Sequence, residues 1–211
     1  MKKNSVCVKK RLLVLCALLS WGPACWSDAV SSALQAKLNA IHTMSATFQQ
    51  VVYAQKREVS RSSGTMALSR PGHFRWQTQK PLEQWVIADG HHLWVYDLDL
   101  EQVTVKKQDK GLGSTAGLFL SGYNGHIAQD FNVTVKTEGN ISRFDLHAKS
   151  SKANFQQVRL IFNNNALGGI ELFDQLGQHT DIHLSQIKTN PTLPVALFQF
   201  KVPKNVDVVE Q

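Results

Sequence analysis

Hydrophobic residues follow a helical period in the segment that begins near position 28. Ser32 and Gln35 have the spacing of a capping box, in which each side chain satisfies a free backbone N–H at a helix start. The pattern predicts one amphipathic helix that ends at about Met44. The apolar residues on its inner face are Leu34, Leu38 and Ile41.

From Ala46 almost to the C-terminus, apolar residues alternate with polar ones at a period of two, which is typical of strands with one buried face. About ten or eleven short antiparallel strands are predicted, in one curved sheet that rolls up to bury its apolar face. The apolar members of the runs are Ala46/Phe48, Met66/Leu68, Phe74/Trp76, Trp85/Ile87, Leu93/Val95, Val103/Val105, Phe131/Val133/Val135, Phe144/Leu146/Ala148, Val158/Leu160/Phe162, Ile170/Leu172, Ile182/Leu184 and Phe198/Phe200/Val202.

Turn signals separate these runs. Asp89-Gly90 joins two of them at a spacing suited to a tight hairpin. Weaker signals lie at residues 138–140, at 163–165 and at Gly177. No linker or internal repeat interrupts the pattern, so we expect one domain.

The alternation stops between Gly111 and Ala128. Ser114 or Thr115 is a candidate cap for a short apolar helix over residues 116–121, which Gly122 would end. Two interpretations stay open at this point: a plug that completes an ordinary core, or a movable lid over a cavity.

The net charge of +7 is uneven along the chain. Five of the 23 basic residues and no acidic ones lie in the first 27 positions, so the rest is nearly neutral, with 18 basic and 16 acidic residues. Affinity for nucleic acid needs clustered cations, and we therefore expect no nucleic-acid binding.

The basic leader continues into an apolar run, residues 12–19, that is too short to span a bilayer and resembles a secretory signal. We expect residues 1–27 to be a signal peptide and the mature chain to be residues 28–211. The alternative is lipidation at Cys25. All three cysteines lie in the leader, so cleavage after Ser27 leaves no thiol, as suits an oxidising compartment.

Candidate catalytic and metal-binding patterns are weak. His179, Asp181 and His183 share one face of a strand, but a solvated outer face explains the same pattern. The acidic residues between 97 and 101 lack the spacing of a calcium loop. No nucleophile elbow, phosphate loop or zinc-protease motif occurs. We expect no enzyme, no cofactor and no metal.

Arg70 is more informative. If Met66 and Leu68 face the interior, the two-residue period sends Arg70 the same way, unless Pro71 bends the strand. A guanidinium beside an apolar cavity needs acceptors, which backbone carbonyls of a covering helix would supply. An outward arginine beside a Pro71-Gly72 turn is the alternative.

Several motifs together resemble the outer-membrane lipoprotein carrier family, LolA, over essentially the whole mature chain. They are Ala46–Gln50, Arg70–Trp76, Lys80-Pro81, Ala88–Gly90, Leu93–Asp97, Asp99–Val103, Phe198–Lys204 and Val206–Val208. Two departures are visible: Thr115-Ala116 stands where the family usually has Thr-Pro, and Asn205 replaces a usual glycine.

The resemblance implies a mainly β fold, a single unclosed antiparallel β-barrel whose apolar inner face is covered by short helices and binds acyl chains. It implies that Arg70 latches the covering helices and that Phe74 accepts cargo from the transporter. Candidate residues of the acyl cavity are Leu34, Leu38, Phe48, Met66, Leu68, Trp76, Leu118 and Phe119.

The same resemblance predicts a monomeric periplasmic chaperone of a Gram-negative cell. Its partners would be triacylated lipoproteins, an inner-membrane lipoprotein-releasing ABC transporter and an outer-membrane lipoprotein acceptor. Three alternatives remain. The protein could be the outer-membrane acceptor itself, with a lipid on Cys25; it could be a periplasmic hydrolase; or it could be a purely structural β domain.

Overall fold

The computed structural model describes residues 25–108, 120 and 127–211. In chain order the elements of this part are α1 (Cys25–Asn39), β1 (Thr43–Ala54), β2 (Arg57–Ser69), β3 (His73–Lys80), β4 (Gln84–Asp89), β5 (His92–Asp97), β6 (Gln102–Lys107), α3 (Ile127–Asp130), β7 (Phe131–Glu138), β8 (Ile141–Ala148), β9 (Phe155–Asn163), β10 (Ala166–Asp174), β11 (Gln178–Thr189), the 3-10 turn η1 (Val195–Phe198) and β12 (Asp207–Glu210).

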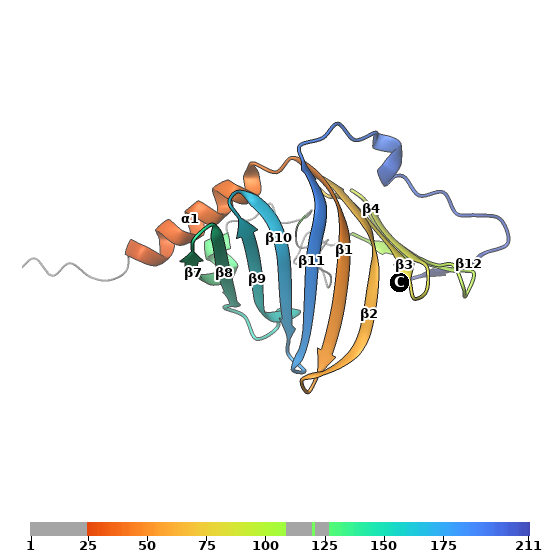
Figure 1. Ribbon diagram of the computed structural model, residues 1–211. Helices are drawn as coiled ribbons and strands as arrows, with labels where there is room; N and C mark the ends of the chain where they lie inside the picture. The colour runs from red at the N-terminus through yellow and green to blue at the C-terminus, as the bar shows by residue number, and fades with distance from the viewer. Residues whose placement is uncertain (1–24, 109–119, 121–126) are drawn as a thin grey trace, which may run out of the picture.

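All twelve strands form one sheet in the order β12-β6-β5-β4-β3-β2-β1-β11-β10-β9-β8-β7. The long strands β1, β2 and β11 lie at its middle, and β12 and β7 are its two edges (Figure 1). The sheet is strongly curved, as the alternation predicted, and unclosed, as the family resemblance implied. The predicted count of ten or eleven strands was too low, and the last strand, β12, runs parallel to β6 rather than antiparallel.

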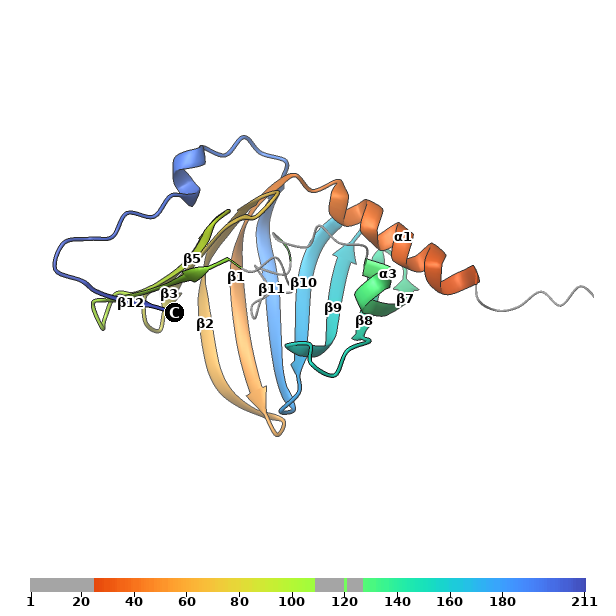
Figure 2. The same cartoon turned by 180° about the vertical axis from the view of Figure 1, so that it is seen from behind.

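The helices cover one half of this sheet. α1 packs against β7 and α3, and α3 packs against β7. Figure 2, the view from behind, shows α1 and α3 in front of the β7–β10 half. Lys37 of α1 fixes the helix further, because its Nζ donates to Oδ1 of Asn165 at 2.8 Å and lies 5.5 Å from the ring centre of Phe162.

The predicted limits of the first helix were wrong at both ends. The helix begins at Cys25, so Ser32 and Gln35 lie in its interior and form no capping box. The Gln35 side chain instead bonds to Asn39 and accepts a hydrogen bond from the N–H of Ile127. The helix ends at Asn39, because the chain from Thr43 onward pairs with two neighbouring strands.

The strand predicted around Phe198, Phe200 and Val202 does not form. The segment starts as the 3-10 turn η1 and continues without strand pairing, near prolines that lack a backbone donor. Its alternating rings pack on the outer face of the sheet instead. Phe200 lies 5.4 Å from the Trp94 ring and 5.9 Å from the Tyr96 ring.

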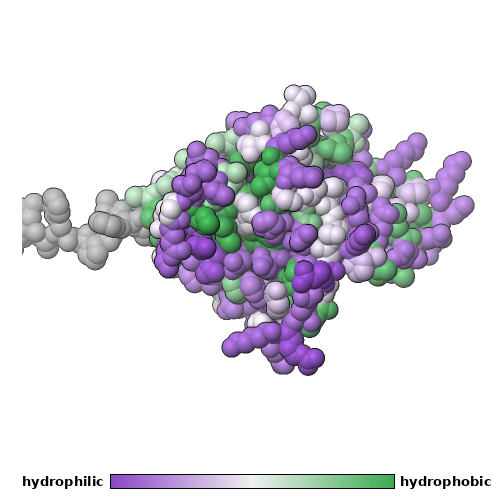
Figure 3. All heavy atoms as spheres, viewed as in Figure 1, coloured by the Kyte–Doolittle hydropathy of each residue, from purple (hydrophilic) through white to green (hydrophobic). Residues whose placement is uncertain are grey.

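Near β3–β6, therefore, both faces of the sheet carry apolar residues. Ile87 of β4, Val103 of β6 and Phe198 of η1 are buried but stand apart from the main core cluster. Elsewhere hydrophilic residues dominate the face seen in Figure 3, with smaller hydrophobic areas between them. The main core lies on the opposite, inner face.

Candidate functional site

The inner face of the sheet carries a continuous apolar surface. Alternate residues of the strands from β3 across to β7 point to it, and α1 adds side chains from above. The structure brings six predicted cavity residues into this one cluster, all between 0% and 9% exposed: Leu34, Leu38, Phe48, Met66, Leu68 and Trp76. Leu118 and Phe119 lie outside the described residues, as does most of the predicted short helix. Leu120, which is described, is helical and 1% exposed.

Stacked aromatic rings occupy part of this inner surface. The Phe48 and Trp76 rings stack with their centres 3.8 Å apart, and Phe74 follows at 6.0 Å from Trp76. Gly64 makes this possible, since a Cβ there would lie 1.9 Å from the carbonyl oxygen of Gln77 and 3.0 Å from the Phe48 ring. The rings can therefore approach the sheet backbone closely.

Phe74, the predicted transporter contact, is only 1% exposed. It lies on the inner face opposite Leu68 of β2 and Ala88 of β4. A partner could therefore touch its ring only after the inner face opens. Its role in accepting cargo stays a prediction.

Arg70 lies in the turn that follows β2. Its backbone N–H donates to the carbonyl of His42 at 2.8 Å. Its Nε is buried and has no hydrogen-bond partner in the described part of the chain. Burial lowers the pKa of Arg70 below its ordinary value. Arg70 as a whole is half-buried, and its buried Nε favours the inward interpretation, because a desolvated donor needs an acceptor.

The outer face of β8–β11 carries a network of charges. Arg159 bonds to Asp145 at 2.6 Å and to Glu171 at 3.0 Å, so hydrogen bonding to Asp145 above all raises the pKa of Arg159. His179 stacks on Phe173 at 4.4 Å. Asp181 and His183 are exposed, as expected for a solvated face. No group of three or more metal-ligating side chains occurs among the described residues.

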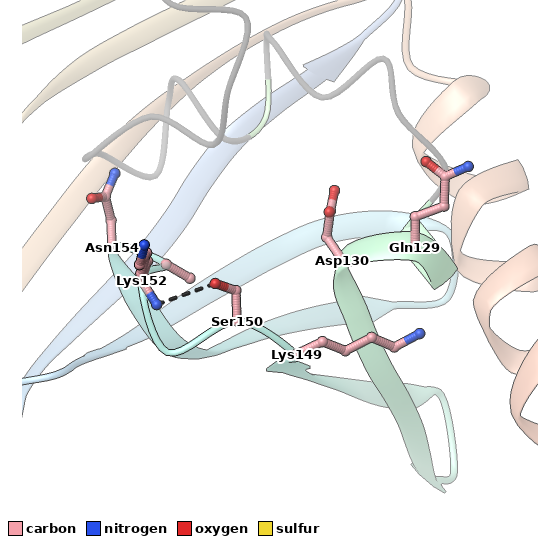
Figure 4. A pocket seen from close by; sticks show the side chains of 7 residues that line it. Gln129, Asp130, Lys149, Ser150, Lys152 and Asn154 are labelled. Atoms are coloured by element: carbon pink, nitrogen blue, oxygen red, sulfur yellow. Dashed lines mark hydrogen bonds between the residues drawn. The ribbon is translucent and has the colours of Figure 1, made fainter.

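A polar cleft of about 400 Å³ lies where α3 meets the loop between β8 and β9 (Figure 4). The Nζ of Lys149 donates to the carbonyl of Ala128, which ties this loop to α3. Six of the seven lining residues are polar, so the cleft differs in character from the apolar inner face. It comprises Gln129, Asp130, Lys149, Ser150, Lys152, Ala153 and Asn154.

No helix in the described ranges is both long and apolar enough to cross a membrane. Within the described residues, the apolar inner face is the feature on which we build a function. Its residues come from distant parts of the chain, and the alternation along each strand was sufficient to predict them. The sequence did not distinguish the outer aromatic residues Trp94, Tyr96 and Phe200 as a separate group, because outer and inner apolar residues alternate along the chain with the same period of two.

Comparisons with known proteins agree with this geometry. A carrier from Legionella pneumophila strain Corby, named outer-membrane lipoprotein carrier protein, is 59% identical over 199 residues, covering 94% of this chain and 98% of the relative. One of the same name from Azotobacter vinelandii strain DJ is 37% identical over 203 residues, covering 95% and 98%.

Solved structures show the same fold at low sequence identity. An uncharacterised conserved protein from Thermus thermophilus superposes with a TM-score of 0.52 at 14% identity, covering 85% of this chain and 99% of the other. The structure of MucB superposes with a TM-score of 0.54 at 13% identity, covering 87% and 66%. The sequence profile of the family described as outer membrane lipoprotein carrier protein LolA matches residues 39–201, and the chain belongs to that family.

Proposed function

We propose that the protein is a periplasmic, non-enzymatic carrier that shelters the acyl chains of lipoproteins on the inner face of its sheet. The observation that carries this proposal is the continuous apolar inner surface, drawn from both halves of an unclosed sheet and covered by α1 over the β7 side. A closed barrel could not part its edges to admit several chains. The names of the relatives support lipoproteins as the cargo.

The physical need for a carrier is large. At about 0.8 kcal/mol per methylene, three acyl chains of roughly fifteen carbons would cost on the order of 35 kcal/mol to expose to water. Cargo that leaves one membrane unassisted would therefore not reach another. An apolar surface that travels with the cargo removes most of this barrier.

Release sets the opposite requirement, because a carrier that binds too tightly never delivers. In our proposal Arg70 stabilises the empty, closed form by donating hydrogen bonds to the segment that covers the inner face. Its buried, unpartnered Nε supports this, since the side chain lies desolvated with unused donor capacity. The cost of opening lowers the net affinity for cargo.

The cycle that we propose has three steps. The carrier loads from an ATP-driven transporter in the inner membrane, diffuses through the periplasm, and transfers its cargo to an acceptor at the outer membrane. No phosphate-binding loop occurs in the sequence, so the energy for loading comes from the transporter. Phe74 would meet the transporter or the arriving cargo once the inner face opens.

The test is native mass spectrometry of the protein purified from its own cell envelope. We expect a bound species whose mass equals one triacylated lipoprotein, lost after transfer to the acceptor. A Met66→Lys variant places a charge on the inner face and should lose the bound species. The control His183→Lys, at an exposed outer position, should keep it. Protein that is always empty, in cells that export lipoproteins, would contradict the proposal.

A further inference from the structure

Two turns lie near each other at one end of the β2–β6 half of the sheet, and Gln108 joins them. It follows the last residue of β6. Its Nε2 donates to the carbonyl of Gly72 at 2.8 Å, and its Oε1 accepts from the N–H of Gly90 at 3.1 Å. Its own N–H donates to the carbonyl of His91 at 2.9 Å. One side chain thus bridges the β2–β3 and β4–β5 turns.

The two bridged turns are in direct contact. Gly72 has a φ of +78° and Gly90 a φ of +94°, values that favour glycine. A Cβ at Gly72 would lie 3.5 Å from Nε2 of Gln108 and 3.7 Å from the Cα of Gly90. The glutamine therefore fills a fitted site and does not merely lie over the surface.

The β2–β3 turn is the one that carries Arg70. Only Pro71, whose ring fixes φ, separates Arg70 from the residue whose carbonyl Gln108 holds. On the same turn, Nδ1 of His73 bonds to the carbonyl of Pro71 at 2.9 Å. The N–H of Arg70 is bonded to His42. The backbone on both sides of Arg70 is thus held, which restricts the directions that its half-buried side chain can take.

We propose that Gln108 is a positioning residue for Arg70. By clamping the Gly72 carbonyl to the β4–β5 turn, it aims the guanidinium into the interior and so maintains the latched, empty form. This inference rests on the latch role of Arg70 in the proposed function. Nothing in the alternation pattern or the family resemblance pointed to Gln108.

The test compares binding of a fluorescent tripalmitoylated lipopeptide by the full-length mature protein and its variants. Gln108→Met keeps the side-chain length but removes both polar contacts. Gln108→Glu keeps the acceptor for Gly90 and removes the donor to Gly72. If Gln108 aims the latch, both variants open more readily and bind the lipopeptide roughly three- to tenfold more tightly.

Two further variants separate positioning from simple stabilisation. Gln175→Ala removes a glutamine hydrogen bond in the other half of the sheet, from Nε2 to the Ala153 carbonyl at 3.4 Å, and should bind like the parent. In an Arg70→Leu background, Gln108→Met should add no further change, because the residue that it positions is gone.

Each other outcome overturns the inference in a distinct way. Gln108 variants that melt earlier but bind with parental affinity would show a purely structural role, while tighter binding by Arg70→Leu would still support the proposed latch. Additive tightening in the double variant would show that Gln108 acts independently of Arg70. Parental affinity of Arg70→Leu itself would overturn the latch and this inference together.

Discussion

Replacing Arg70 by leucine should leave the stability of the fold nearly unchanged while it changes the protein's affinity for cargo. Arg70 holds a buried Nε with no partner in the described part of the chain, and burial lowers its pKa. Leucine removes that unsatisfied donor and fills part of the same space with aliphatic atoms. In the proposed function, the substitution also removes the hydrogen bonds that keep the empty form closed.

Removal of the unsatisfied donor stabilises the fold, and loss of the proposed hydrogen bonds destabilises it by a similar amount. An unsatisfied buried donor costs about 1–3 kcal/mol, and a hydrogen bond to a charged group contributes about 1.5–3 kcal/mol. We therefore expect the free energy of unfolding to change by less than about 1.5 kcal/mol. If the intrinsic contacts with cargo are unchanged, the shift from the closed to the open form should tighten cargo affinity about ten- to a hundredfold.

Two assays check this prediction. Urea unfolding followed by tryptophan fluorescence measures stability, and acceptor-dependent release of bound lipoprotein measures retention. Arg70→Leu should unfold near the parental midpoint yet retain cargo in the presence of acceptor. Arg143→Leu, at a pair with Glu138 on the β7–β8 hairpin, is the matched control and should release normally. Release by Arg70→Leu at the parental rate would refute the latch.

Three further predictions follow from the inner face and the turns. Gly64→Ala should destabilise the fold by at least about 1–3 kcal/mol in urea unfolding, because its Cβ would overlap the Gln77 carbonyl; a parental midpoint would contradict this. Phe74→Glu should impair crosslinking to the transporter and lower stability by at least about 2 kcal/mol, because it buries a carboxylate, whereas Phe74→Leu should fold and reveal the loading role alone. Burial alone would raise the pKa of Asp89, but hydrogen bonds from Trp94 and two backbone N–H groups hold that pKa below its ordinary value. The stability that Asp89 contributes should therefore be complete above its unfolded pKa of about 3.9 and be lost as the pH falls through the lower folded pKa. Asp89→Asn should accordingly be less stable than the parent at pH 7, and the two should converge in acid.

The inner face could be predicted from the sequence because a period of two determines which residues share a side. Phe48, Met66, Leu68 and Trp76 each follow that alternation, and the sheet brings them together as expected. The turn at Asp89-Gly90 was predictable for a similar local reason: Asp89 caps the N–H groups of His91 and His92, and Gly90 supplies the positive φ.

Features that depend on the rest of the molecule could not be predicted in this way. Alternation at Phe198 and Phe200 looks like a strand, yet these rings pack on an outer face that already holds Trp94 and Tyr96. Met44 continues the helical spacing, but pairing with β2 and β11 places it in a strand. Gln108 has no sequence signal, because its partners are backbone groups of two distant turns.

Photocrosslinking of a bound lipopeptide shows whether acyl chains lie on the inner face of the sheet. A tripalmitoylated lipopeptide with a diazirine near the end of one chain would be bound, irradiated and mapped by peptide mass spectrometry. We expect labels on inner residues such as Phe48, Met66 and Leu160. Labels confined to outer residues such as Trp94 and Phe200, with the inner face unmodified, would contradict it.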